Sequence, residues 1–158
     1  MKPESFHDLL LEGLKFLYHA EQQVFKSWPR MMRAASERAL QSAFQEQLHR
    51  TREHAAKLEQ IFDKFGLPFR GKRCEALGRF LDNGRAVMNG DFQPHIRDAG
   101  LISVAQKIKH YQMAGYGSVR TYSELLGDEE AADLLQQALD EEGVADKKLT
   151  GIARGLNF

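Results

Sequence analysis

The amino-acid sequence predicts an all-α protein that folds as a four-helix bundle with one long crossover connection. Apolar residues recur in steps of three and four along four long segments, and strict alternation over the length of a strand is missing. Between the second and third of these segments, residues 66–94 carry several glycines and only a short apolar pattern. The length of 158 residues fits one domain, so we expect residues 1–158 to form a single bundle.

The first two segments predict an antiparallel pair of helices. The first helix is expected from about residue 4 to residue 34, with a bend at Pro29, because proline removes a backbone donor and crowds the preceding turn. A short connection near Ala35 to Glu37 leads into the second helix, which Gly66 and Pro68 should end. The apolar stripes that predict these helices are Phe6, Leu10, Leu14, Leu17, Val24, Trp28 and Met32, and then Leu40, Phe44, Leu48, Ala55, Leu58, Phe62 and Phe65.

The crossover predicts that the second and third long helices run parallel. Its glycines stand at positions 71, 78, 84 and 90, and the apolar residues between them indicate one short helix inside a long connection. A short loop would make the two long helices antiparallel neighbours, whereas a connection of this length lets them run in the same direction. The third long helix is expected from about residue 94 to residue 126, on a buried stripe that ends at Leu126. Gly127 should end it, and Asp128 should cap the fourth helix.

Charge and composition exclude several classes of partner. The chain has 22 Lys and Arg against 22 Asp and Glu, a net charge of zero, whereas a sequence-independent nucleic-acid binder needs a surplus of cations. It has no secretory signal pattern and no apolar run of the roughly 18 residues that a membrane span needs. Cys74 is the only cysteine and cannot form an internal disulfide. We therefore expect a cytoplasmic protein that binds neither nucleic acid nor membranes.

Polar residues interrupt the apolar stripes at the middle of each long helix. Glu21 lies in step with Leu17 and Val24, and Glu142 lies in step with the apolar residues of the fourth helix. A charge in a bundle core is costly enough to need a partner or a metal ion. The other polar residues at this depth are Thr51 on the second stripe, His54 at its edge, Gln112 on the third stripe, Lys109 and Tyr116 on the flank beside Gln112, and Glu141 beside Glu142.

Inward carboxylates at one level of a bundle are typical of a carboxylate-bridged dinuclear metal site, in which Glu and Glu-x-x-His residues project inward. An internal salt-bridge network explains the same pattern without a metal. Glu46 and His49 form a literal Glu-x-x-His, but both lie nearly opposite the apolar stripe, so we interpret them as a solvated surface pair. Cys74 follows Lys72 and Arg73, which favour a thiolate, yet it has no histidine close in sequence, and we expect a structural role.

Several longer motifs resemble the YciE/YciF family of bacterial ferritin-like proteins. The stretches that carry the resemblance are FLYHAEQQVFKSWPRM, QLHRTREHAAKLEQIF, KRCEAL, IRDAGLISVAQKIKHYQMAGYGSVRTYSELLG and ALDEEGVADKKLTGIA, which follow one another over nearly the whole chain. The resemblance implies a ferritin-like four-helix bundle that is cytoplasmic, homodimeric and linked to stress responses. It implies no particular reaction, and it names no catalytic residue.

The resemblance also implies which positions hold metal, and this chain departs from them on the third long helix. Glu21 and Glu142 match, and His54 stands where the family has Gln or His. Lys109 and Gln112 stand where the family has Glu, and Arg50 replaces a position that is often Glu or Gln.

Two functions follow from this departure, and a third is independent of it. We favour a degenerate site, in which Glu21, His54, Lys109, Gln112 and Glu142 form a metal-free polar network in a structural or partner-binding protein. The alternative is an active di-iron or di-manganese protein that oxidises iron or removes peroxide. Its ligands would be Glu21, His54, Gln112 and Glu142, with Tyr116 nearby. The third is a bundle that binds another macromolecule through an exposed face.

Overall fold

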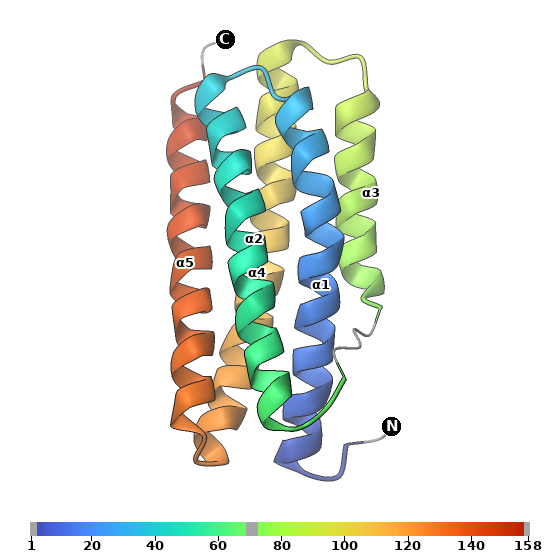
Figure 1. The fold of residues 1–158 in the computed structure, drawn as a ribbon. Coiled ribbons are helices and arrows are strands. Elements are labelled where there is room, and N and C mark those ends of the chain that lie inside the picture. The colour runs from blue at the N-terminus through green and yellow to red at the C-terminus, as the bar shows by residue number, and fades with distance from the viewer. Residues whose placement is uncertain (1–2, 69–72, 157–158) are drawn as a thin grey trace.

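The computed structural model describes residues 3–68 and 73–156, which form five α-helices. Four long helices stand side by side and a shorter one, α3, lies against their outside (Figure 1). Each long helix packs against two others, in the order α1, α2, α5, α4 around the bundle. The fold is the expected all-α, ferritin-like four-helix bundle with a helix inside its crossover.

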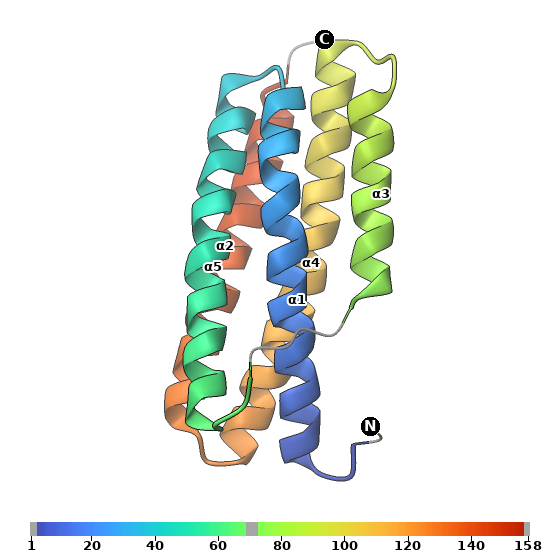
Figure 2. The same cartoon turned by 45° about the vertical axis from the view of Figure 1, so that its right-hand side comes forward.

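The first two long helices form the expected antiparallel pair. Helix α1 (Phe6–Ala34) begins after Ser5, whose hydroxyl oxygen accepts the Asp8 N–H at 3.1 Å, and it continues through Pro29. Helix α2 (Arg38–Lys64) runs back beside it (Figure 2). Gly66 follows the end of α2 with a φ of 63°, a left-handed conformation that glycine adopts without steric cost.

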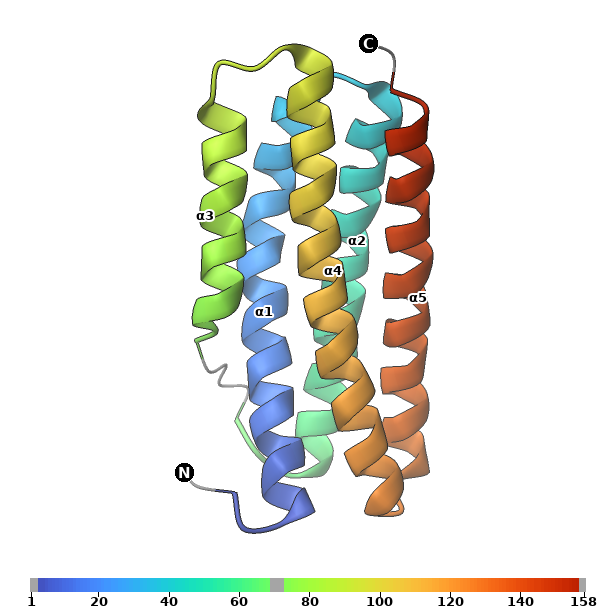
Figure 3. The ribbon, with the colours of Figure 1, turned by 180° about the vertical axis from the view of Figure 1, so that it is seen from behind.

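The crossover places α2 and α4 in the same direction, as predicted. Helix α3 (Glu75–Asn89) packs on α1 and α4, on the outside of the four-helix bundle (Figure 3). Helix α4 (Pro94–Leu125) then runs downward in Figure 1, as α2 does and opposite to α1 and α5. Gly71 and Lys72, which belong to the predicted crossover pattern, lie outside the described residues.

The turn between α4 and α5 is built as the sequence predicts, except at Leu126. Gly127 has a φ of 74°, and Asp128 caps α5 (Glu129–Arg154) by accepting the Ala131 N–H at 3.1 Å. We expected Leu126 on the buried stripe, but it is 43% exposed, because α4 ends at Leu125. The residue that this last turn buries is Ser123.

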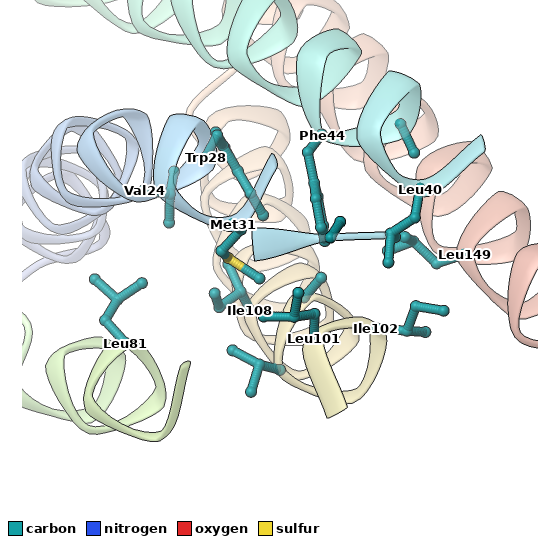
Figure 4. Close-up of a cluster of buried hydrophobic side chains, with 14 of the residues drawn as sticks. Val24, Trp28, Met31, Leu40, Phe44, Leu81, Leu101, Ile102, Ile108 and Leu149 are labelled. Carbon is teal, nitrogen blue, oxygen red and sulfur yellow. The ribbon is translucent and has the colours of Figure 1, made fainter. Parts of the chain in front are cut away.

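Two apolar clusters fill the bundle, one toward each end. The cluster nearer the α1–α2 loop contains Trp28 and Phe44, and Leu81 of α3 contributes to it (Figure 4). The other cluster contains Leu14, Phe62 and other side chains from α1, α2, α4 and α5. Buried polar side chains lie at the intervening depth, halfway along the long helices. Apart from Asp98, which lies at the α1–α2 loop, the buried charged side chains of the described residues therefore share one level of the bundle.

Asp98 fastens the loop between α1 and α2 to α4. Its carboxylate is 1% exposed and accepts the Ser36 N–H at 2.9 Å and the Glu37 N–H at 2.8 Å. These N–H groups come immediately before α2, whose N-cap residue Glu37 makes no side-chain capping bond. A carboxylate from α4 thus holds the two residues that lead into α2, and its negative charge near the start of that helix suits the helix dipole.

We expect the substitution Asp98→Asn to lower the free energy of unfolding by about 1–3 kcal/mol, because an amide has one acceptor oxygen for two N–H groups and buries a donor that has no acceptor there. Urea denaturation measures this loss. Asp133→Asn, at an exposed position on α5, is the matched control and should change stability by less than about 0.5 kcal/mol. Equal effects at the two positions would show that Asp98 does not hold the loop.

Candidate functional site

A layer of buried polar side chains crosses the middle of the bundle. All four long helices contribute, and each side chain is at most 2% exposed. We call this set the polar layer. Its members are Glu21 of α1, His54 of α2, Lys109, Gln112 and Tyr116 of α4, and Glu142 of α5.

Helical spacing brings these residues to the bundle axis. Glu21 lies between Leu17 and Val24, which are both fully buried, so its side chain must share their inward face. On α4, residues three and four positions apart share a face, which places Lys109, Gln112 and Tyr116 in a row. The inward positions predicted for Glu21, Gln112 and Glu142 are confirmed. His54 was expected at the edge, and Lys109 and Tyr116 on the flank, but all three are buried.

An ion pair joins α4 to α5 inside the layer. Lys109 Nζ lies 3.0 Å from Glu142 Oε2 and donates a hydrogen bond to Oε1 at 3.2 Å. The ammonium group also lies 5.0 Å from the centre of the Trp28 ring, a cation–π contact. Burial alone would raise the pKa of Glu142, but the positive charges of Lys109 and His54 hold it below its usual range. Glu142 is therefore ionised at neutral pH.

His54 carries the second positive charge of the layer. Its Nδ1 lies 3.2 Å from Glu142 Oε1 and 3.6 Å from Glu21 Oε1, and its Nε2 lies 2.9 Å from Glu141 Oε2. Burial alone would lower the pKa of the imidazole, but hydrogen bonding and the charges of Glu142 and Glu21 outweigh it and raise the pKa to about 10. Glu141 itself stays at the rim, 28% exposed, and pairs with Lys57 at 3.3 Å.

Tyr116 closes the layer on the α1 side. Its hydroxyl donates to Glu21 Oε1 at 2.6 Å, and burial together with the charge of Glu21 raises the pKa of Tyr116 well above its usual value. The hydroxyl therefore remains protonated and keeps donating. Among the described residues, the polar-layer atoms without a hydrogen-bond partner are Glu21 Oε2, both amide atoms of Gln112, and His54 Nδ1 and Glu142 Oε2, which have charge contacts only.

The other candidates from the sequence lie away from the layer. Glu46 and His49 are exposed on α2, as predicted, and Glu46 pairs with Lys148 at 2.8 Å. Cys74 is buried, and its sulfur accepts the Leu77 N–H at the start of α3. The Cys74 sulfur also lies 3.2 Å from the Tyr111 hydroxyl. This position matches the structural role expected for Cys74.

Comparison with known proteins identifies the family. The model of a domain of unknown function, DUF892, matches residues 5–157. Protein YciF of Escherichia coli strain K12 is 32% identical over 154 residues, which cover 97% of this chain and 93% of that protein. The chain belongs to the YciE/YciF family.

Solved structures extend this similarity to the whole fold. The crystal structure of the E. coli stress protein YciF superposes with a TM-score of 0.91 at 32% identity and covers 96% of both chains. YcfI from Rhodopseudomonas palustris gives a TM-score of 0.89 at 31% identity, over 93% of this chain and 94% of that one. The long crossover and the helix within it therefore belong to the YciE/YciF architecture.

The donor set of this YciE/YciF protein could hold one metal ion. Among the described residues, Glu21, His54 and Glu142 each offer a ligand atom, and these atoms lie within 4.8 Å of one another. Two carboxylates and one imidazole suit iron or manganese. Metal binding would require the His54 imidazolium to lose its proton.

The same set does not fit two divalent ions. Only two carboxylates of the layer are buried, and the ammonium of Lys109 already contacts both oxygens of Glu142. Lys109 and His54 balance the charges of Glu21 and Glu142, so the layer is neutral without any metal. Gln112 adds only a neutral amide where the family resemblance implies a carboxylate.

We expect Lys109→Met to lower the free energy of unfolding by about 3–5 kcal/mol, because it leaves the buried carboxylate of Glu142 without its main partner. Lys109→Met combined with Glu142→Gln should recover at least about 1 kcal/mol of that loss, since the two residues are coupled. Chemical denaturation of both single variants and the double variant measures the coupling. Lys107→Met, at an exposed position on the same helix, is the control, and purely additive losses would contradict the pairing.

Proposed function

We propose that this chain is a ferritin-like, stress-associated protein whose dinuclear metal site is degenerate, and that it acts as a structural or partner-binding homodimer. The observation that carries the proposal is the contact of Lys109 Nζ with Glu142 at 3.0 Å, in the layer where related bundles place metal ligands. An ammonium group at that distance balances the negative charge of Glu142, as a bound metal ion would otherwise do.

Electrostatics support this proposal over a loaded dinuclear centre. Two divalent ions bring four positive charges, and Lys109 and His54 would add two more unless both lost their protons or moved away. The raised pKa of His54 shows how strongly the carboxylates already hold its proton. A metal ion would have to break the Lys109 ion pair to use Glu142 as a ligand, and it would have to displace that proton to use His54.

The second candidate is a metal-dependent oxidoreductase, and the group of Glu21, His54 and Glu142 favours it. In that case Gln112 would contribute a neutral amide oxygen, and the bound iron or manganese would supply the redox chemistry for iron oxidation or peroxide removal. The chain's own part would be to hold the ion with Glu21 and Glu142. Tyr116 would keep donating to Glu21.

Metal analysis separates the two candidates. We expect protein purified from cells supplemented with iron and manganese to contain far less than one ion per chain. The double variant Lys109→Glu with Gln112→Glu should gain about two ions per chain, because it supplies the two carboxylates that helix α4 lacks and removes the ammonium. Elemental analysis by mass spectrometry gives both numbers.

The matched control is Lys107→Glu with Gln137→Glu, which makes the same charge change at exposed positions and should bind no additional metal. About two ions per chain in the unmodified protein would overturn the degenerate site. If the double variant Lys109→Glu with Gln112→Glu stays free of metal, these two positions alone do not account for the loss of metal binding.

The proposal of a homodimer rests on the family resemblance and on exposed apolar side chains. At the end of the bundle where α1 begins and α4 ends, Phe6 is 50% exposed, Leu125 60% and Leu126 43%. The Phe6 ring lies 6.1 Å from that of Tyr122, so side chains of the two helices adjoin there. Exposed apolar groups that gather in this way are typical of a surface that another protein covers. We propose that the second copy of the chain covers this surface in the homodimer.

Light scattering measures the molar mass of the purified protein in solution, and we expect the mass of a dimer. Leu125→Glu should shift the population toward monomer, because it places a charge in an apolar contact. Val144→Glu, at a position that is 69% exposed on α5, is the control and should leave the mass unchanged. A monomeric parent protein would refute the dimer.

We also propose a cytoplasmic location, with neither nucleic acid nor membrane among the partners. The support is the net charge of zero and the likeness to YciF. In the part of the chain that the structure describes, no helix combines the length and the apolar character needed to cross a membrane.

A further inference from the structure

A hollow of about 470 Å³ lies between α1 and α3, and no residue of the polar layer lines it. The two helices run side by side in the same direction, so that both end at the same end of the molecule (Figure 1). Each contributes residues at positions i, i+3 and i+4, which share one face of a helix. The lining residues are Arg30, Arg33 and Ala34 of α1 and Arg85, Met88 and Asn89 of α3.

The hollow presents guanidinium groups that lack an acceptor. Arg30 and Arg33 are exposed, and in the described part of the chain neither has a hydrogen-bond or ion-pair partner. Arg85 contacts Asp82 through one nitrogen, which leaves the N–H groups of its other nitrogens available. None of the described residues that line the hollow carries a carboxylate. Its polar lining therefore consists of N–H donors and the side-chain amide of Asn89.

The two unpaired cations of α1 stand one helical turn apart. Like charges at this spacing repel each other. Arg33 lies in the last turn of α1, where the negative end of the helix dipole offsets part of its charge, but Arg30 precedes that turn, and the dipole field fades within it. A ligand that brings negative charge to both guanidinium groups removes the repulsion.

A phosphate monoester is the anion that fits this pair. It carries a charge of about −1.5 to −2 at pH 7 and three acceptor oxygens, so one group can balance two cations. A guanidinium group also binds phosphate oxygens through two parallel hydrogen bonds. The hollow lies within the range of about 300–1,000 Å³ that small-molecule pockets occupy, so it has room for more than the phosphate group.

We propose that this hollow binds a small phosphomonoester, with its dianionic phosphate on Arg30 and Arg33. The body of the ligand lies over Met88, where the Asn89 amide and the Arg85 guanidinium bind its oxygen atoms. This site lies beyond the proposed function, because it shares no residue with the polar layer or with the apolar surface proposed for the dimer.

Titration calorimetry with matched small molecules tests the proposal. The monoesters are adenosine monophosphate, glucose phosphate and glycerol phosphate, and each is compared with the same molecule without its phosphate. Cyclic adenosine monophosphate is a phosphodiester with one negative charge, and inorganic phosphate has the charge without a body. At least one monoester should bind about tenfold more tightly than its uncharged counterpart and than inorganic phosphate, the difference that one good contact supplies.

Arg30→Gln and Arg33→Gln should each weaken the best monoester about tenfold and leave its uncharged counterpart unaffected, since each removes one charged contact with the phosphate. Both residues are exposed, so the variants should fold, and circular dichroism checks this. Arg79→Gln, at an exposed position of α3 outside the hollow, makes the same change of charge and is the control.

The proposal fails if no monoester binds more tightly than its uncharged counterpart. Equal affinity for adenosine monophosphate and its cyclic form would show that the second charge is not used, and equal affinity for inorganic phosphate would show that the body is not recognised. Either result would overturn the phosphomonoester site. Binding that survives both Arg30→Gln and Arg33→Gln, or that Arg79→Gln weakens equally, would place the ligand elsewhere and would also overturn it. None of these outcomes bears on the degenerate metal site.

Discussion

The ion pair of Lys109 with Glu142 is the interaction on which the middle of the bundle depends. Both side chains are almost completely removed from water, where a charge without an opposite charge beside it would be strongly destabilising. The pair also determines what surrounds it: Trp28 covers the ammonium, and His54 approaches the same carboxylate from α2. A dinuclear metal centre would need carboxylates where the chain now supplies this cation.

The remainder of the fold positions that pair. The long crossover lets α4 run parallel to α2 and antiparallel to α5, so that Lys109, His54 and Glu142 arrive at one depth from three helices. The apolar clusters on either side exclude water and strengthen every charge contact between them. The hydrogen bonds from Ser36 and Glu37 to Asp98 tie α4 to the α1–α2 loop, and α3 covers the outside of α1 and α4.

Helical periodicity was sufficient to predict the bundle and the inward residues on its stripes, including Glu21, Gln112 and Glu142. It placed His54, Lys109 and Tyr116 at an edge or flank, because a stripe alone does not show how far a neighbouring helix wraps around it. From the sequence, Lys109 was expected in one polar network with Glu21 and Glu142, and the structure pairs it with Glu142. The loop contact of Asp98 was not predicted, although Asp98 stands three and four residues before the buried Leu101 and Ile102, a spacing that would have placed it on their face.

Anomalous diffraction tests the central claim most directly. Crystals would be soaked in excess Fe²⁺ or Mn²⁺, and data would be collected on both sides of the absorption edge of each metal. The account predicts no anomalous peak within bonding distance of Glu21 and Glu142, with the Lys109 ammonium still in contact with Glu142. One or two peaks among Glu21, His54 and Glu142, with the Lys109 side chain turned away, would contradict it.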